Sequence, residues 1–97
     1  MNTDLTTLQE LVLDLVADRH ESVEDMEIEV RLLLGNGVSR AQMTEALEGL
    51  RDAGLVDAFV FREAEKDFQR YRRPRVKAGA RLWWFATDAG RRALAAP

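Results

Sequence analysis

The chain has 97 residues, of which 46% are hydrophobic, and its 14 basic and 17 acidic residues leave a net charge of −3. This length and composition favour a single domain, 1–97, with enough apolar content for a compact core. The absence of cysteine excludes disulfides, thiolate metal sites and cysteine nucleophiles. No long apolar run and no basic leader occur, so we expect a cytoplasmic protein without membrane contact.

The first predicted helix has apolar residues at spacings of three and four, which is typical of an amphipathic helix. This stripe consists of Leu5, Leu8, Leu11, Val12, Leu15 and Val16. We expect Asp4 or Thr3 to cap the helix. His20, the only histidine, lies near the end of the helix, where a cation complements the helix dipole. A structural or solvated role is therefore expected for His20.

Ser22 is predicted to cap a second helix, which Gly35-Asn36-Gly37 would end. Its expected inner face consists of Val23, Met26, Val30, Leu33 and Leu34. Ser39 and Gln42 form a capping-box pair for a third helix that ends at Gly54. Helical periodicity places Met43, Ala46, Leu47 and Leu50 inward and Ala41, Glu45, Glu48 and Asp52 outward.

Two strand-like segments follow, Leu55–Phe61 and Leu82–Ala86, and we expect them to pair. Thr87 is a suitable N-cap for a final helix. The predicted order is therefore helix, helix, helix, strand, strand, helix. This order indicates a mainly α fold with a two-stranded β wing.

Two motifs carry a resemblance to a known family. The first is Ala46-Leu47-Glu48-Gly49-Leu50-Arg51-Asp52-Ala53-Gly54-Leu55-Val56, and the second is Trp84-Phe85-Ala86-Thr87-Asp88-Ala89-Gly90-Arg91-Arg92-Ala93-Leu94. Together they resemble the winged helix-turn-helix domain of small bacterial regulators of the PadR and MarR types, although Ala86 stands where those families usually carry leucine. The resemblance implies binding to double-stranded DNA and regulation of transcription.

Charge is distributed unevenly along the chain. Residues 1–61 hold 4 basic and 13 acidic residues, a net of −9, whereas residues 62–97 hold 10 basic and 4 acidic residues, a net of +6. The basic residues are densest between Arg70 and Lys77, in a long connection from Arg62 to Ala80 that we expect to be a loop. Such a loop can contact phosphates or can be a solvated hairpin tip.

The resemblance therefore predicts two groups of DNA-contacting residues. The basic loop would hold phosphates, and the N-terminal end of the third helix would contact base edges. The predicted residues are Arg70, Arg72, Arg73, Arg75 and Lys77 in the loop, and Arg40, Gln42 and Thr44 in the helix. The three acids on the outward face of that helix oppose this interpretation, because they would repel DNA. The alternative is a protein-interaction module of the same fold that binds an unidentified protein partner instead of DNA.

Both faces of the predicted hairpin are apolar, although a two-stranded wing buries only one face on its own helices. Three coverings are considered: the terminal helices, a second copy of the chain, or an aromatic small molecule. We expect a homodimer with Phe59, Phe61, Trp83 or Trp84 at its interface. The chain shows no glycine-rich phosphate loop, no nucleophile elbow and no Cys/His ligand set. We therefore expect no enzymatic activity, no metal and no cofactor.

Overall fold

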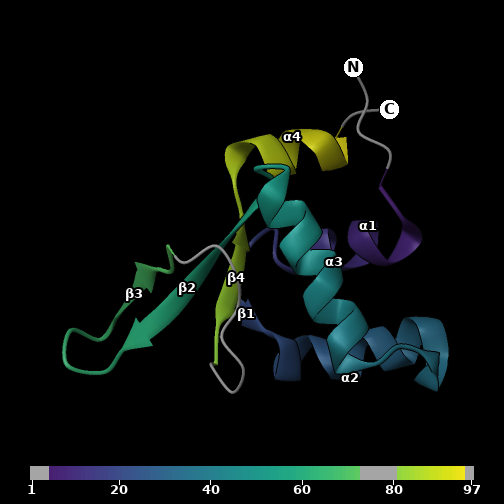
Figure 1. Ribbon diagram of the computed structural model, residues 1–97, viewed down its shortest axis with the longest axis horizontal. Coiled ribbons are helices and arrows are strands. Elements are labelled where there is room, and N and C mark those ends of the chain that lie inside the picture. The colour runs from purple at the N-terminus through teal and green to yellow at the C-terminus, as the bar shows by residue number, and fades with distance from the viewer. Residues whose placement is uncertain (1–4, 73–80, 96–97) are drawn as a thin grey trace.

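The computed structural model describes residues 5–72 and 81–95. Within these residues the elements are α1 (Thr7–Leu15), β1 (Glu21–Ser22), α2 (Val23–Leu34), the 3-10 helix η1 (Gly35–Gly37), α3 (Arg40–Asp52), β2 (Val56–Arg62), β3 (Asp67–Arg70), β4 (Trp83–Ala86) and α4 (Asp88–Ala95). The strands form one antiparallel sheet in the order β1-β4-β2-β3 (Figure 1).

The expected fold class, mainly α with a two-stranded wing, is wrong. The described residues form an α+β structure with four α-helices and a four-stranded sheet. The expected pairing of the two longer strand segments is confirmed, because Val56 lies opposite Ala86 and Phe59 opposite Trp83. The two additional strands flank this pair. β1 has only two residues, and β3 lies within the charged connection that was expected to be a loop.

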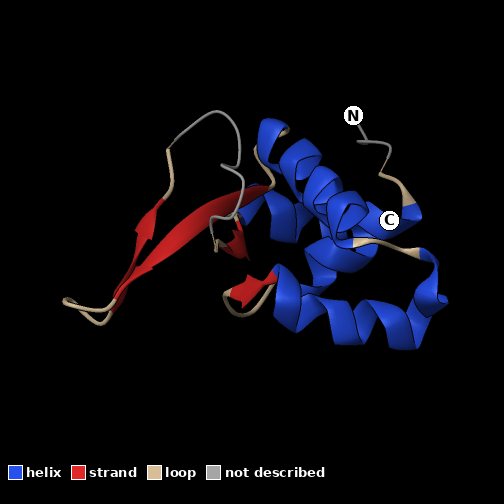
Figure 2. Cartoon of the chain, turned by 60° about the horizontal axis from the view of Figure 1, so that its bottom comes forward, coloured by secondary structure: helices blue, strands red, loops and turns tan. Residues whose placement is uncertain are grey.

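The core lies between the helices and one face of the sheet. β2 and β4 present alternating buried residues to it, and Val56 and Trp84 are 0% and 1% exposed. The helices supply Val12, Leu13, Val16, Met26, Val30, Met43, Ala46, Leu47 and Leu50. The helices gather on one side of the molecule, and the β2–β3 hairpin extends away from them on the other (Figure 2).

The helix starts follow from capping side chains. The hydroxyl of Thr6 accepts a hydrogen bond from the backbone N–H of Gln9, whose side-chain oxygen accepts one from Thr6 N, both at 3.0 Å. The caps expected at Asp4 or Thr3 lie outside the described residues. The capping box of Ser39 and Gln42 is confirmed. These reciprocal bonds satisfy N–H groups that a helix start otherwise leaves unpaired.

The inner face of α2 is shorter than expected. Met26 and Val30 are buried, but Leu33 is 62% and Leu34 is 40% exposed. Residues 31–37 are all exposed, so the last turn of α2 and all of η1 extend beyond the packed part of the helix. Helical periodicity predicts which side of a helix is apolar, but the end of the supporting core is set by tertiary structure.

Candidate nucleic-acid interface

The β2–β3 hairpin is the most projecting part of the described chain (Figures 1 and 2). A turn over residues 63–66 joins the strands, and Lys66 adopts a left-handed backbone with φ of 56°. Phe61 lies opposite Phe68 and Arg62 opposite Asp67, so the pairing reaches the turn. Residues 62–67 are all exposed. The hairpin therefore offers its polar side chains to a large partner.

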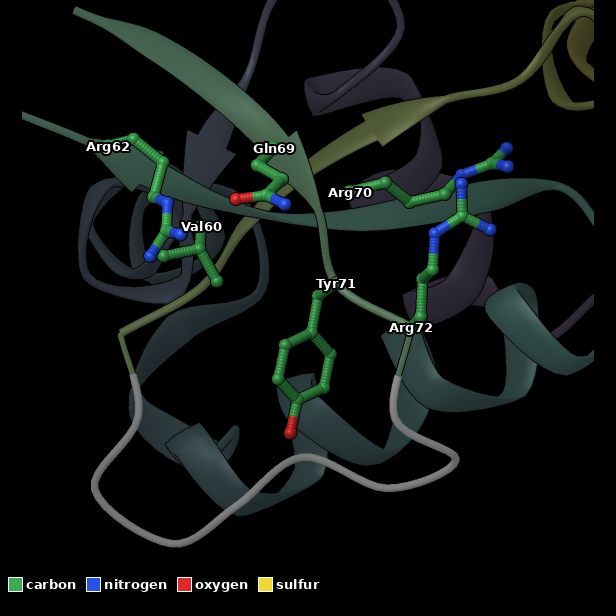
Figure 3. A pocket seen from close by; sticks show the side chains of 6 residues that line it. All are labelled: Val60, Arg62, Gln69, Arg70, Tyr71 and Arg72. Atoms are coloured by element: carbon green, nitrogen blue, oxygen red, sulfur yellow. The ribbon is translucent and has the colours of Figure 1, made fainter. Parts of the chain in front are cut away.

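An open hollow of about 400 Å³ lies along this hairpin. It is lined by Val60, Arg62, Gln69, Arg70, Tyr71 and Arg72. Figure 3 shows the side chains of Arg70 and Arg72 extending to the same side of the hollow, with Arg62 at the other side. Guanidinium groups present several donors in a planar fork that fits phosphate oxygens. The chemistry of this lining is therefore suited to an anion.

Two of these arginines have no carboxylate partner among the described residues. Arg70 pairs with Asp57 at 2.6 Å between Nη2 and Oδ2. Across residues 5–72 and 81–95, neither Arg62 nor Arg72 takes part in an ion pair, whereas most other described arginines do. Arg62 was not among the predicted contacts, because it stands at the start of the long connection and outside the dense basic run from Arg70 to Lys77.

The base of the hairpin is fastened to α3. The guanidinium of Arg51 donates to the carbonyl of Tyr71 at 2.9 Å, and its Cζ lies 5.4 Å from the centre of the Tyr71 ring. The same guanidinium forms an ion pair with Glu48, whose Oε1 lies 3.4 Å from Arg51 Nη1. Glu48 was expected on the outward face of this helix, and that expectation is wrong because its side chain is only 10% exposed. The ion pair with Arg51 accounts for a buried carboxylate at this position.

Two of the three predicted base-reading residues at the start of α3, Arg40 and Gln42, make side-chain contacts within the protein. Arg40 forms a hydrogen-bonded ion pair with Glu27 of α2. This hydrogen bond lowers the pKa of Glu27 against the opposing effect of burial, and it raises the pKa of Arg40. The side-chain oxygen of Gln42 accepts from Ser39 N at 2.7 Å, and Thr44 is half-buried. These contacts compete with any use of Arg40 and Gln42 on DNA.

A second hollow, of about 500 Å³, lies between α1 and α3 and carries acidic residues. Its lining includes Gln9, Glu45, Glu48 and Asp52, without any lysine or arginine. Glu45 and Asp52 are exposed, as expected for the outward face of α3. This surface is unfavourable for phosphates. The acidic and basic surfaces therefore belong to different elements, α3 and the β2–β3 hairpin.

The outer face of the sheet carries most of the residues predicted for a dimer interface. Phe59, Phe61 and Trp83 are half-buried on this face. The prediction of Trp84 at a dimer interface is wrong, because alternation along β4 places its side chain on the opposite face. There it lies in the core and is 1% exposed. The sequence could not decide between the adjacent tryptophans, since both sheet faces were apolar.

His20 covers part of this face. Its imidazole stacks on Phe68, with centroids 4.0 Å apart and planes 3° apart, and on Phe85 at 4.6 Å and 15°. It also meets Phe59 edge-on at 4.8 Å. Burial lowers the pKa of His20 below 6.5, and the charge of Asp67 opposes this shift. This packing is not evident from the sequence, because Phe68 reaches the face only through β3, a strand whose charged sequence resembles a loop.

Several site predictions concern other parts of the chain. Arg73, Arg75 and Lys77 lie outside the described residues. Within residues 5–72 and 81–95, no group of three His, Asp or Glu side chains could hold a metal ion. In the same ranges, every helix is too short or too polar to cross a lipid bilayer.

Comparison of this chain with protein-family models, with curated proteins and with solved structures gives no match.

Proposed function

We propose that this protein binds DNA by holding backbone phosphates on the β2–β3 hairpin, and that it acts as a regulator of transcription of the kind its sequence resembles. The supporting observation is the pair of arginines, Arg62 and Arg72, that line an open hollow without a carboxylate partner among the described residues. A partner phosphate would supply the missing counter-charge. This function requires neither catalysis nor a cofactor.

We assign most of the affinity for DNA to the β2–β3 hairpin and not to α3. Use of Arg40 on DNA would break its contact with Glu27, and use of Gln42 would break the capping box. Glu45 and Asp52 on α3 would also meet phosphates of like charge. Contacts to phosphate position a protein without reading sequence. The proposed binding by the hairpin is therefore largely independent of DNA sequence.

Charge-matched arginine variants test this proposal. Fluorescence anisotropy would measure binding to a duplex of about 20 base pairs at about 50 mM salt, where phosphate contacts are strong. We expect Arg62→Ala and Arg72→Ala each to weaken binding about tenfold. Arg92→Ala is the matched control, because Arg92 is exposed on α4 and its substitution removes the same charge from a different surface. Absence of duplex binding by the unmodified protein would rule out the proposal.

An apolar patch on α2 favours a second candidate function, a protein-interaction module. Ile28, Leu32, Leu33 and Leu34 are 65%, 76%, 62% and 40% exposed. Large apolar side chains that gather on one exposed helix mark protein-interaction surfaces. A homodimer through this patch would replace or accompany the dimer expected through Phe59, Phe61 and Trp83.

A further inference from the structure

The outer face of the sheet is an aromatic surface built by three neighbouring strands. We use the term aromatic face for Phe59, Phe61, Phe68, Trp83 and Phe85. Register places Phe59 opposite Trp83 and Phe61 opposite Phe68, so these rings project from the same side of β2, β3 and β4. All five are half-buried, whereas the residues of β2 and β4 that face the core are mostly buried.

The aromatic face already holds one flat nitrogen heterocycle. The imidazole of His20 lies between Phe68 and Phe85 and nearly parallel to both rings. Those two phenylalanines come from strands on either side of β2, and Phe59 of β2 meets the imidazole edge-on. The strands on either side of β2 are about 9–10 Å apart, which leaves room for one ring between the two side chains. Rings on this face are thus spaced for stacking with planar ligands.

Cationic groups lie beside these rings. Arg70 is opposite Phe59 in the sheet register, and the guanidinium of Arg81 lies 5.1 Å from the centre of the Trp83 ring. Arg91 lies 5.3 Å from the Phe85 ring. Each of these arginines also has a carboxylate partner: Asp57 lies 2.6 Å from Arg70, Glu24 lies 4.0 Å from Arg81, and Asp88 lies 2.5 Å from Arg91. Flat rings beside cations are complementary to a polyanion that carries exposed planar bases.

We propose that the aromatic face stacks unpaired bases of a single-stranded nucleic acid whose phosphates lie on the β2–β3 hairpin. This inference rests on the phosphate contact of the proposed function and adds the class of base that the other face of the same sheet accepts. Val60, Arg62 and Gln69, which line the hollow, alternate along β2 and β3 with the rings of the aromatic face. A duplex hides the faces of its bases within its own stack and exposes only groove edges, so it could use the hairpin but not the rings. Trp83 and Phe61 are the rings assigned to the strand, because His20 stacks on neither.

An abasic strand separates stacking from phosphate binding. Anisotropy would compare an oligo(dT) of about 12 nucleotides with an abasic oligomer of the same length and charge, and with oligo(U). We expect both base-bearing strands to bind at least about tenfold more tightly than the abasic oligomer. The higher affinity of the two identifies DNA or RNA as the preferred strand, and either result supports stacking.

Tryptophan fluorescence gives a second readout at the face itself. The chain has two tryptophans, and Trp84 is 1% exposed in the core. A base that stacks on Trp83 should therefore quench part of the emission, and the abasic oligomer should not. Trp83→Phe should remove this quenching while retaining the ring that binds.

Ring-retaining and ring-removing variants test whether flatness matters. Trp83→Leu should weaken oligo(dT) binding about 5- to 100-fold, while Trp83→Phe should retain most of it. Phe61→Leu and Phe61→Tyr form a second pair on β2, which keeps the test valid if one variant fails to fold. Circular dichroism and thermal unfolding would establish the folded state of each. Equal losses in both members of each pair would contradict stacking.

The remaining outcomes separate this inference from the proposed function. Equal affinity for oligo(dT) and the abasic oligomer would overturn stacking and leave phosphate binding by the hairpin intact. Binding of no oligomer and no duplex would overturn both. A homodimer that Trp83→Leu dissociates, with no quenching by oligo(dT), would assign the aromatic face to a second copy of the chain and overturn the inference.

Discussion

The hydroxyl of Thr87 donates a hydrogen bond to the backbone carbonyl of Gly54, with 2.7 Å between the two oxygens. The same hydroxyl accepts from Gly90 N at 3.0 Å, and Thr87 N donates to the carbonyl of Leu55 at 3.0 Å. Thr87 thus caps α4 and fastens it to the exit of α3. The two motifs that carry the family resemblance therefore contact each other, which gives their residue types a structural reason.

Gly90→Ala should destabilise the protein strongly. A methyl group at Gly90 would lie 2.0 Å from the carbonyl oxygen of Leu55 and 3.2 Å from Leu13 Cδ1, and the backbone atom cannot move aside cheaply. We expect the free energy of unfolding in urea to fall by about 1–3 kcal/mol. Gly37→Ala is the control, because nothing lies within 4 Å of its added methyl group. Similar effects of the two substitutions would contradict this packing.

Glu48→Gln should destabilise the fold, whereas Glu45→Gln should not. Glu48 is buried beside Arg51, so neutralising it removes a negative charge 3.4 Å from a largely buried guanidinium. We expect a loss of about 1–3 kcal/mol in the free energy of unfolding for Glu48→Gln. Glu45 is exposed, and its substitution should change that free energy by less than about 0.5 kcal/mol. Chemical denaturation of both variants checks the contrast.

His20 should make stability depend on pH. Burial lowers its folded-state pKa below the unfolded value of 6.5, so the unfolded chain takes up this proton first as pH falls. The stability contributed by neutral His20 is therefore complete above pH 6.5 and is lost as pH falls through the folded pKa. The wild-type urea midpoint should decline over this range more than that of His20→Phe, which keeps a ring without a titrating group. Parallel declines in the two proteins would refute the prediction.

Leu32→Asp should abolish self-association through the α2 patch without affecting the fold. Leu32 is 76% exposed, so the substitution removes no core contact but places a charge in the centre of the patch. Sedimentation velocity should show a concentration-dependent dimer for the wild type and a monomer for Leu32→Asp. Trp83→Ala serves as the control for the aromatic face. A dimer that is lost with Trp83→Ala and retained with Leu32→Asp would move the interface to the sheet.

The sequence predicts features that depend on neighbouring residues, such as helix caps, better than features that depend on pairing between distant segments. The caps at Ser22, Ser39 and Thr87 are confirmed, because each depends on residues within a few positions of one another. β1 was missed because two residues carry no alternation, and their strand geometry depends on pairing with β4. β3 was missed because its charged sequence is typical of a loop. Its strand geometry depends on pairing with β2, in which Phe68 lies opposite Phe61.

In the candidate site, too, the residues within one segment were predicted and the contacts between distant segments were not. Arg70 and Arg72 were predicted from the charge density of their segment together with the family resemblance, and both line the hairpin hollow. Arg62 joins them only because β2 and β3 pair to the turn, which brings a residue distant in sequence to the same surface. The engagement of Arg40 by Glu27 depends on how α2 packs beside α3. No local pattern specifies that contact.

If the hairpin arginines hold nucleic-acid phosphates, the affinity of the protein for duplex DNA must fall as salt concentration rises. Each neutralised phosphate contributes about −0.9 to the slope of log affinity against log salt. The double variant Arg62→Ala/Arg72→Ala should therefore flatten the wild-type slope by about two units, while Arg92→Ala leaves it unchanged. An unchanged slope in the double variant, or equal flattening by Arg92→Ala, would contradict the assignment of phosphate binding to the β2–β3 hairpin.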